Sequence, residues 1–286
     1  MDINNINHVG MAVRDLTATA ARYEAMGFQL TPYSPHSGAF KPGEPVKPLG
    51  SGNRCVMFEN NYLEILANED NSRPADRMIK WLGHHQGAHI ICFDSGDCAH
   101  VDARVRGLGI ETSGVIPLQR EIDTPEGVRT AKFERCQLAA NNSPEGYIQF
   151  TRHLTPQYIY QPRYIQHANG SVQLAETVLV ADDLDGFVKK YSAYLPVAPV
   201  RYGNGAQFKL PLGTTLTILG LSDARAMLPG TLMPPIPGIA AVAFRTAKLA
   251  ETRERLAGAG FTAIDLGERF MVPAEEASGV AVIFGS

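Results

Sequence analysis

Hydrophobic and polar residues follow the same order four times along this chain. Each time, a short run of mostly apolar residues leads into an amphipathic stretch, which ends at a turn signal. The four runs open at His8, His89, Glu176 and Ala240. Three amphipathic stretches end at a glycine followed by an apolar residue, at Gly27, Gly109 and Gly260, and the other ends at Tyr194-Leu195-Pro196. This recurring order at a fixed spacing predicts a repeated strand and helix.

Three further strands are expected after each helix. In the first repeat we expect a strand at 6–13, a helix at 16–26 and strands at 28–31, 54–59 and 62–66. In the second we expect a strand at 88–93, a helix at 97–107 and strands at 115–118, 130–138 and 146–151. The third and fourth repeats run over 174–219 and 239–284. The chain is therefore predicted to be an α+β protein of four βαβββ modules.

Two such modules, packed sheet to sheet, can form a half-barrel whose concave face holds a ligand. We expect modules 5–68 and 86–152 to form one domain over 1–152, and a degenerate domain of the same type over 172–286. The segment 153–171, which contains Pro156, Pro162 and Asn169-Gly170, is expected to be a linker. We also expect a long loop at 32–52, a hairpin turn at Asn60-Asn61 and a solvated turn at His84-His85.

The composition narrows the classes of partner. A net charge of −3 over 286 residues gives no basic surface for nucleic acid. No apolar run reaches the roughly 18 residues that span a membrane, and the first residues lack the pattern of a signal peptide. The cysteines lack metal-site spacing and are expected to be free thiols of a reducing cytoplasm: Cys55, Cys92, Cys98 and Cys136. We therefore expect a cytoplasmic protein with a small-molecule partner.

The openings and endings of the modules suggest a metal site. Alternate residues of a strand face the same side, so His8 and Gly10 are expected to share a face. The strands that end each module place one polar residue among apolar ones, namely Glu64 in the first module and Gln149 in the second. A cleft between these modules would gather His8, Glu64, His89 and Gln149. Two imidazoles and one carboxylate with open positions are a known arrangement for a divalent metal.

Other interpretations of these residues remain open. Each histidine alone is more simply read as a half-buried imidazole at a strand start. A carboxylate at Glu64 between apolar neighbours is costly without a partner, which favours the metal. Gln149 is either a weak ligand or a hydrogen-bonding group beside the metal, and His153 is a further weak catalytic candidate at the cleft mouth. The corresponding residues of the last two modules cannot hold a transition metal: Glu176, Thr217, Ala240 and Val282.

The openings His8-Val-Gly-Met-Ala-Val-Arg-Asp-Leu16 and Gly87-Ala-His89, with the endings Tyr62-Leu-Glu64 and Gly146-Tyr-Ile-Gln149, resemble the vicinal oxygen chelate superfamily. This superfamily includes glyoxalase I, extradiol dioxygenases and fosfomycin- and bleomycin-resistance proteins. The segments Thr151-Arg-His-Leu-Thr-Pro156 and His167-Ala-Asn-Gly170 are similar to glyoxalase-like domain proteins. The resemblance implies paired βαβββ modules with metal ligands at His8, Glu64 and His89. Gln149 departs from the usual glutamate, which puts ordinary glyoxalase chemistry in doubt because an amide cannot relay a proton.

The resemblance and the residues together predict a metal-dependent enzyme. Its substrate would be a small molecule with vicinal oxygens, and its reaction that of a lyase or isomerase, or of a ring-cleaving dioxygenase. The cofactor would be a divalent ion such as Fe, Mn, Zn or Ni. The alternative is a protein of the bleomycin-resistance type that sequesters a small molecule without chemistry. A homodimer is left open.

Overall fold

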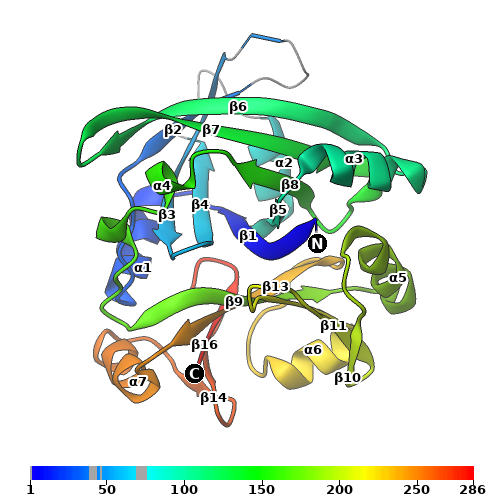
Figure 1. Ribbon diagram of the computed structural model, residues 1–286. Helices are drawn as coiled ribbons and strands as arrows, with labels where there is room; N and C mark the ends of the chain where they lie inside the picture. Colours follow the sequence, from blue (N-terminus) through cyan, green and yellow to red (C-terminus); the bar gives the residue numbers. More distant parts are fainter. Residues whose placement is uncertain (1, 39–43, 46, 69–75) are drawn as a thin grey trace.

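A computed structural model describes residues 2–38, 44–45, 47–68 and 76–286. Its strands form two eight-stranded sheets, one from each half of the chain (Figure 1). The first sheet has the spatial order β2 (Ser34–Gly38), β3 (Lys47–Met57), β4 (Tyr62–Asn68), β1 (Ile3–Ala12), β5 (Gly87–Ser95), β8 (Tyr147–His153), β7 (Gly127–Leu138), β6 (Thr112–Thr124). The second has the order β10 (Val200–Tyr202), β11 (Gly205–Lys209), β12 (Thr215–Leu219), β9 (Ser171–Val180), β13 (Gly238–Thr246), β16 (Ala281–Gly285), β15 (Phe270–Val272), β14 (Ile264–Asp265).

One helix of each module lies against its sheet, and further helices join the modules. The module helices are α1 (Leu16–Ala25), α3 (Cys98–Gly107), α5 (Leu184–Tyr194) and α7 (Leu249–Gly258). The others are α2 (Asp76–His84), α4 (Pro156–Ile159) and α6 (Leu221–Met227), with short 3-10 turns at η1 (Ala140–Asn142) and η2 (Pro162–Tyr164). Among the described residues, no helix is both long and apolar enough to cross a membrane.

The ends of the module helices explain the repeated sequence signals. Asp15, Asp97 and Asp183 each accept a backbone N–H of the first turn, as N-capping carboxylates do. After α1 and α3 the chain turns through Gly27 and Gly109, whose φ angles of +90° and +76° favour glycine. The glycine steps in the sequence are thus helix-ending turns.

The modules of each half join edge to edge. β1 pairs antiparallel with β5 in the centre of the first sheet, and β9 pairs with β13 in the same way in the second. The predicted α+β fold of four βαβββ modules paired in two half-barrels is therefore confirmed, with the first module beside the second. One expectation was wrong: the two modules of a half do not pack sheet to sheet but form one continuous sheet. Sheet-to-sheet packing occurs instead between the two halves of the chain.

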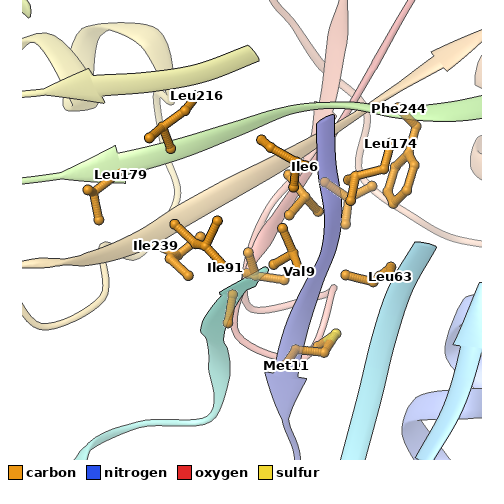
Figure 2. Packing of buried hydrophobic residues seen from close by; sticks show 14 of the residues in the cluster. Ile6, Val9, Met11, Leu63, Ile91, Leu174, Leu179, Leu216, Ile239 and Phe244 are labelled. Atoms are coloured by element: carbon orange, nitrogen blue, oxygen red, sulfur yellow. The ribbon is translucent and has the colours of Figure 1, made fainter. Parts of the chain in front are cut away.

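The hydrophobic core lies between the two sheets (Figure 2). Val9 and Met11 of β1 pack there with Leu174 of β9 and Phe244 of β13, and all four are at most 1% exposed. Because strand residues alternate in direction, the neighbours His8 and Gly10 face the opposite surface of the first sheet. This largest core therefore covers one face of each sheet, while smaller apolar clusters pack on the opposite faces, and it is on that opposite face of the first sheet that a site can form.

The segment between the halves is part of this packing. His167 accepts the backbone N–H of Gln29 at 3.0 Å through Nδ1 and donates to the Met57 carbonyl at 2.9 Å through Nε2. The side chain of Asn169 donates to the Met26 carbonyl at 3.0 Å, and the backbone carbonyl of Asn169 accepts the Thr252 hydroxyl at 2.6 Å. The motif His167-Ala-Asn-Gly170 thus serves the fold by joining both halves.

Two elements of the first half differ from the sequence prediction. The second strand is β2 at Ser34–Gly38, inside the segment expected to be a long loop, and not at 28–31. Helix α2 forms over Asp76–His84, where a turn was expected at His84-His85. His84 is exposed as predicted, but His85, directly after this helix, is half-buried. The expected turn at Asn60-Asn61 does join β3 to β4.

Candidate metal site

His8 is held in one tautomer by the residue before it. The amide nitrogen of Asn7 donates to Tyr160 Oη at 3.1 Å and to Asp94 Oδ1 at 3.5 Å. Asn7 Oδ1 therefore faces His8, and it lies 2.8 Å from His8 Nδ1. Since that oxygen can only accept, Nδ1 of His8 carries the proton and Nε2 presents a lone pair.

Glu64 lies beside His8 because β4 runs parallel to β1, with Glu64 opposite Gly10. Its Oε2 is 3.8 Å from His8 Nε2, and its Oε1 accepts a hydrogen bond from Asn53 at 2.5 Å. Burial by itself raises the pKa of this carboxyl, but hydrogen bonding and charge from His36, with His8 and Asn53, outweigh it and lower the pKa to about 2. Glu64 is therefore a carboxylate at neutral pH.

The lone pair of His8 and the carboxylate of Glu64 thus face each other. Burial lowers the pKa of His8 to about 4 against the opposing effect of Glu64, so the imidazole is neutral. With the proton on Nδ1, no hydrogen bond joins Nε2 to the Glu64 oxygen across 3.8 Å. Two acceptors that face each other in a buried site are the arrangement that a cation stabilises.

Gln149 completes this side of the site. Its amide Nε2 donates a hydrogen bond to His8 Nε2 at 3.4 Å, and its Oε1 is buried without a hydrogen-bond partner. A half-turn of the amide exchanges the two atoms and brings the oxygen toward the imidazole. The orphaned oxygen, the neutral imidazole and the carboxylate are donors that suit a divalent metal. Among the described residues, however, no three His, Cys, Asp or Glu side chains form a group that could hold a metal ion.

His89 lies elsewhere on the same sheet. Its Nε2 is 3.0 Å from the His85 carbonyl, and its ring stacks on Trp81 of α2 at 5.4 Å. The strand register shifts between Gly10 and Met11, which face Ile90 and Ala88, so His89 lies at a bulge. In β5 it is Ile90 that corresponds to His8, since Ile90 faces Tyr147 as His8 faces Tyr62. The structure therefore brings His8, Glu64 and Gln149 together and directs His89 toward α2.

Ile90 fills the space beside Gly10. A Cβ at Gly10 would lie 2.7 Å from Ile90 Cδ1, so the glycine allows the two strands to approach rather than leaving room for a ligand.

His153 and Arg120 border the site. The ring of His153 packs edge-on against Phe133 at 5.0 Å and stacks near Tyr160 at 5.5 Å, and its Nδ1 is buried without a partner. The Arg120 guanidinium lies over Phe133 at 5.6 Å and donates to Ser34 Oγ at 3.3 Å. It forms no ion pair with a carboxylate of the described residues.

Sequence reasoning missed two groups that contact Glu64. His36 Nε2 of β2 lies 3.6 Å from Glu64 Oε1, and Asn53 of β3 donates to the same oxygen. His36 belongs to a Pro/Gly/Ser-rich segment without strand periodicity, so no pattern indicated that it would reach the sheet. Asn53 precedes the strand predicted at 54–59. An earlier start of that strand would have placed it opposite Leu66, two residues beyond Glu64 on the same face.

In the second half of the chain, Glu176 occupies the position of His8, but no metal site is expected there. Glu176 of β9 accepts the Thr217 hydroxyl at 2.5 Å through one oxygen and Arg269 Nη1 at 2.7 Å through the other. Both oxygens thus accept hydrogen bonds from protein groups, whereas only Oε1 of Glu64 does so, from Asn53. A surface cavity of about 490 Å³ near Arg269 and Asp223 lies in this half, away from His8.

Buried neutral histidines make the fold sensitive to acid. Burial lowers the pKa of His8 to about 4 and that of His153 to about 3, compared with about 6.5 in an unfolded chain. Between these values the unfolded chain binds protons that the folded protein does not, so the free energy of unfolding falls as the pH drops from about 6.5 to 4. Glu64, with its lowered pKa, adds to the loss only below about 4.5.

We therefore expect His153→Gln to have a shallower pH dependence than the wild type. Between pH 6.5 and 4.5, the free energy of unfolding of the wild type should fall by about 2 kcal/mol more than that of His153→Gln. Urea unfolding followed by circular dichroism at several pH values measures it. His100, whose side chain is 64% exposed, provides the control as His100→Gln. Equal slopes for wild type and His153→Gln would contradict the buried, neutral state of His153.

Solved structures share this two-sheet architecture. A hypothetical protein from Staphylococcus aureus has a TM-score of 0.65 at 13% identity, with 98% of each chain covered. A variant of 4-hydroxymandelate synthase from Streptomyces coelicolor has a TM-score of 0.61 at 11% identity, over 99% of this chain and 92% of that one. A xylose isomerase-like TIM barrel/4-hydroxyphenylpyruvate dioxygenase fusion protein has a TM-score of 0.58 at 13% identity, over 99% and 49%. These similarities define the class as a glyoxalase/dioxygenase-type fold.

Within that class, the chain belongs to the glyoxalase-like domain family, whose model matches residues 6–195. The match covers the first sheet, the connecting segment and the start of the second sheet. The predicted resemblance is therefore confirmed. A search of curated proteins gave no match.

Proposed function

We propose that this protein is a metal-dependent enzyme that acts on a small molecule with two neighbouring oxygen atoms. The observation that carries this proposal is the pair of buried acceptors, His8 Nε2 and Glu64 Oε2, that face each other at 3.8 Å. The fixed tautomer of His8 and the orphaned Oε1 of Gln149 support the same conclusion. A divalent ion bound there would polarise the neighbouring oxygens of a substrate as a Lewis acid.

The protein groups around this position have separate roles. Asn7 keeps the His8 proton on Nδ1 and so directs the Nε2 lone pair into the site. Asn53 holds one oxygen of Glu64 by a hydrogen bond. Gln149 can orient or ligate, but its amide cannot take up and return a proton at neutral pH.

The lack of a second carboxylate bears on the class of reaction. Of the described residues that contact His8, Glu64 alone carries a carboxyl group. His153 is a weak base because burial lowers its pKa to about 3. These residues favour an oxidative reaction such as ring cleavage over an isomerisation that depends on proton transfer by the enzyme.

Arg120 supports an acidic substrate. Its guanidinium lies 5.6 Å from the Phe133 ring, which packs edge-on against His153, and its charge helps to lower the pKa of both His8 and His153. Its Nε is buried without a hydrogen-bond partner. A carboxylate on the substrate would satisfy this group with a charge-assisted hydrogen bond.

An activity screen tests the proposal. Protein loaded in turn with Fe²⁺, Mn²⁺, Zn²⁺ or Ni²⁺ is mixed with catechols, with and without a carboxylate, and oxygen consumption is followed. Hemithioacetals and α-hydroxyketones are screened in parallel by absorbance. Turnover that His8→Ala removes supports an enzyme, and a preference for acidic catechols supports the role of Arg120. Saturable binding of these compounds without turnover would favour sequestration, the function that the replacement of glutamate by Gln149 leaves open.

The substitution Gln149→Glu should strengthen metal binding. It adds a negative charge close to His8 and Glu64, so the affinity for a divalent ion should rise by about tenfold or more. Calorimetric titration of wild type and variant with Mn²⁺ measures the change. The control is Gln207→Glu, which adds the same charge in β11 of the second sheet. Weaker affinity in a folded Gln149→Glu variant would show that residue 149 does not face the metal.

A further inference from the structure

A cavity in the second half of the chain has no part in the proposed function. Its volume is about 490 Å³, within the range of about 300–1,000 Å³ that is typical of small-molecule pockets. Residues of β10, of α6 and of the turn from β14 to β15 line it. Because β10 and β14 are the two edge strands of the second sheet, the cavity lies between the edges of the second half-barrel.

The cavity is on the face of the second sheet that corresponds to the face of the candidate site in the first. Val178 and Val180 of β9 pack in a cluster of their own, whereas Leu179 between them belongs to the core shared by the two sheets. Leu219 and Met227, which line the cavity, pack in the cluster of Val178. The cavity therefore lies on the face that points away from the shared core.

One residue connects the cavity to the position of His8. Arg269 lines the cavity, and its Nη1 lies 2.7 Å from Oε2 of Glu176, which occupies that position in the second sheet. The second half therefore has a cleft at the place equivalent to the candidate site, lined with polar groups of a different kind.

The charges at the cavity leave one carboxylate without a counter-ion. Arg269 is paired with Glu176 at 2.7 Å, and Asp265 is paired with Arg253 at 3.5 Å. Within the described parts of the chain, Asp223 of α6 forms no ion pair. The cavity therefore carries one unbalanced negative charge, which favours a cationic ligand.

The turn after β10 holds the Asp223 carboxylate without using all of its acceptor sites. Oδ2 of Asp223 accepts the backbone N–H of Asn204 at 2.9 Å, and Oδ1 accepts the side-chain amide of Asn204 at 3.3 Å. Each carboxylate oxygen can accept a second hydrogen bond. A protonated amine would supply it as a charge-assisted hydrogen bond.

The rest of the lining suits an apolar group. Leu219, Met227 and Leu266 contribute apolar side chains, and Tyr202, which is 37% exposed, adds an aromatic ring. An apolar ligand body would be removed from water by these side chains, and the face of an aromatic ring attracts a cation.

We propose that this cavity binds a protonated amine with an apolar body, held through its ammonium group by Asp223. A carboxylate of the same size would be repelled by Asp223, and an alcohol would lack the charge. The cavity is separate from the candidate metal site, so this inference does not depend on the proposed metal dependence.

NMR titrations with three probes of one size test the class of ligand. Hexylammonium, 1-hexanol and hexanoate are added at pH 7 in the presence of EDTA, and the methyl resonances of ¹³C-labelled methionines are recorded. Met227 lines the cavity and Met11 lies in the shared core, so the first resonance should shift and the second should not. We expect hexylammonium to bind about tenfold more tightly than 1-hexanol, and hexanoate to bind most weakly.

Three substitutions test the location. Asp223→Asn keeps the size of the side chain and should lower the affinity for hexylammonium to that for 1-hexanol. Ala226→Trp fills the cavity from an exposed position of α6 and should remove the binding of all three probes. Asp185→Asn changes an exposed aspartate of α5 and is the control, with a change in affinity of less than about twofold. Circular dichroism confirms that each variant is folded.

Three results would overturn the proposal. Wild-type protein that does not bind hexylammonium would exclude the site. Equal affinity for the three probes, or a preference for hexanoate, would show that Asp223 does not select the ligand. Undiminished binding of hexylammonium in folded Asp223→Asn or Ala226→Trp would show that the ligand binds elsewhere.

Discussion

Replacing Glu64 by glutamine is expected to abolish divalent metal binding while the fold remains intact. The substitution keeps the size of the side chain and an oxygen for the Asn53 hydrogen bond. It removes the negative charge that faces His8 and His36. Loss of groups that only support metal ligands costs 10–100-fold in affinity, so loss of the ligand charge should cost at least 100-fold.

The chain contains its own control for this experiment. In the second sheet Glu176 occupies the position of His8, and Thr217 occupies that of Glu64. Thr217 and Arg269 donate hydrogen bonds to the two oxygens of Glu176. Glu176→Gln should therefore bind Mn²⁺ like the wild type in calorimetric titration. Equal losses in the two variants would mean that the effect on Glu64 is not local to a metal site.

Replacing Lys190 by alanine is expected to cause the largest loss of stability. Glu145, between the first-sheet strands β7 and β8, is 3% exposed, and both of its oxygens lie 2.7 Å from Lys190 Nζ of α5. Tyr191 donates a further hydrogen bond to this carboxylate at 2.9 Å. Removing the cation leaves a buried charge without its partner, which should lower the free energy of unfolding by about 3–5 kcal/mol.

The exposed pair of Lys248 and Glu251 gives the comparison. Their side chains are 59% and 69% exposed, so Lys248→Ala should cost at most about 1 kcal/mol. Urea unfolding at pH 7 measures both variants. A loss below about 1 kcal/mol in Lys190→Ala would show that the contact between the halves does not depend on this ion pair.

The fold could be predicted because its signals are local and repeated. Aspartate caps such as Asp15 and turn glycines such as Gly27 fix the helix ends through the backbone of one or two turns. The strand β2 and the helix α2 were missed for the opposite reason. Ser34–Gly38 contains proline and glycine and forms a strand only because it pairs with β3.

The site could be predicted only in part. His8, Glu64 and Gln149 follow from strand alternation, and the structure places them together. His89 was assigned by counting residues from the start of its module, and a bulge of one residue in β5 changes which side chain corresponds to His8. His36 contacts Glu64 where the pairing of β2 with β3 shifts register at the sheet edge. This shift is set by tertiary pairing and has no periodic signal in the sequence.

We expect His8 and Glu64 to hold a metal ion, and a crystal structure of the protein soaked with Co²⁺ would show the ion directly. The anomalous difference map locates the ion independently of any activity. We predict one strong peak within bonding distance, about 2.0–2.2 Å, of His8 Nε2 and a Glu64 oxygen. No peak between these two side chains at saturating Co²⁺, or a hydrogen-bonded water there in its place, would contradict the account.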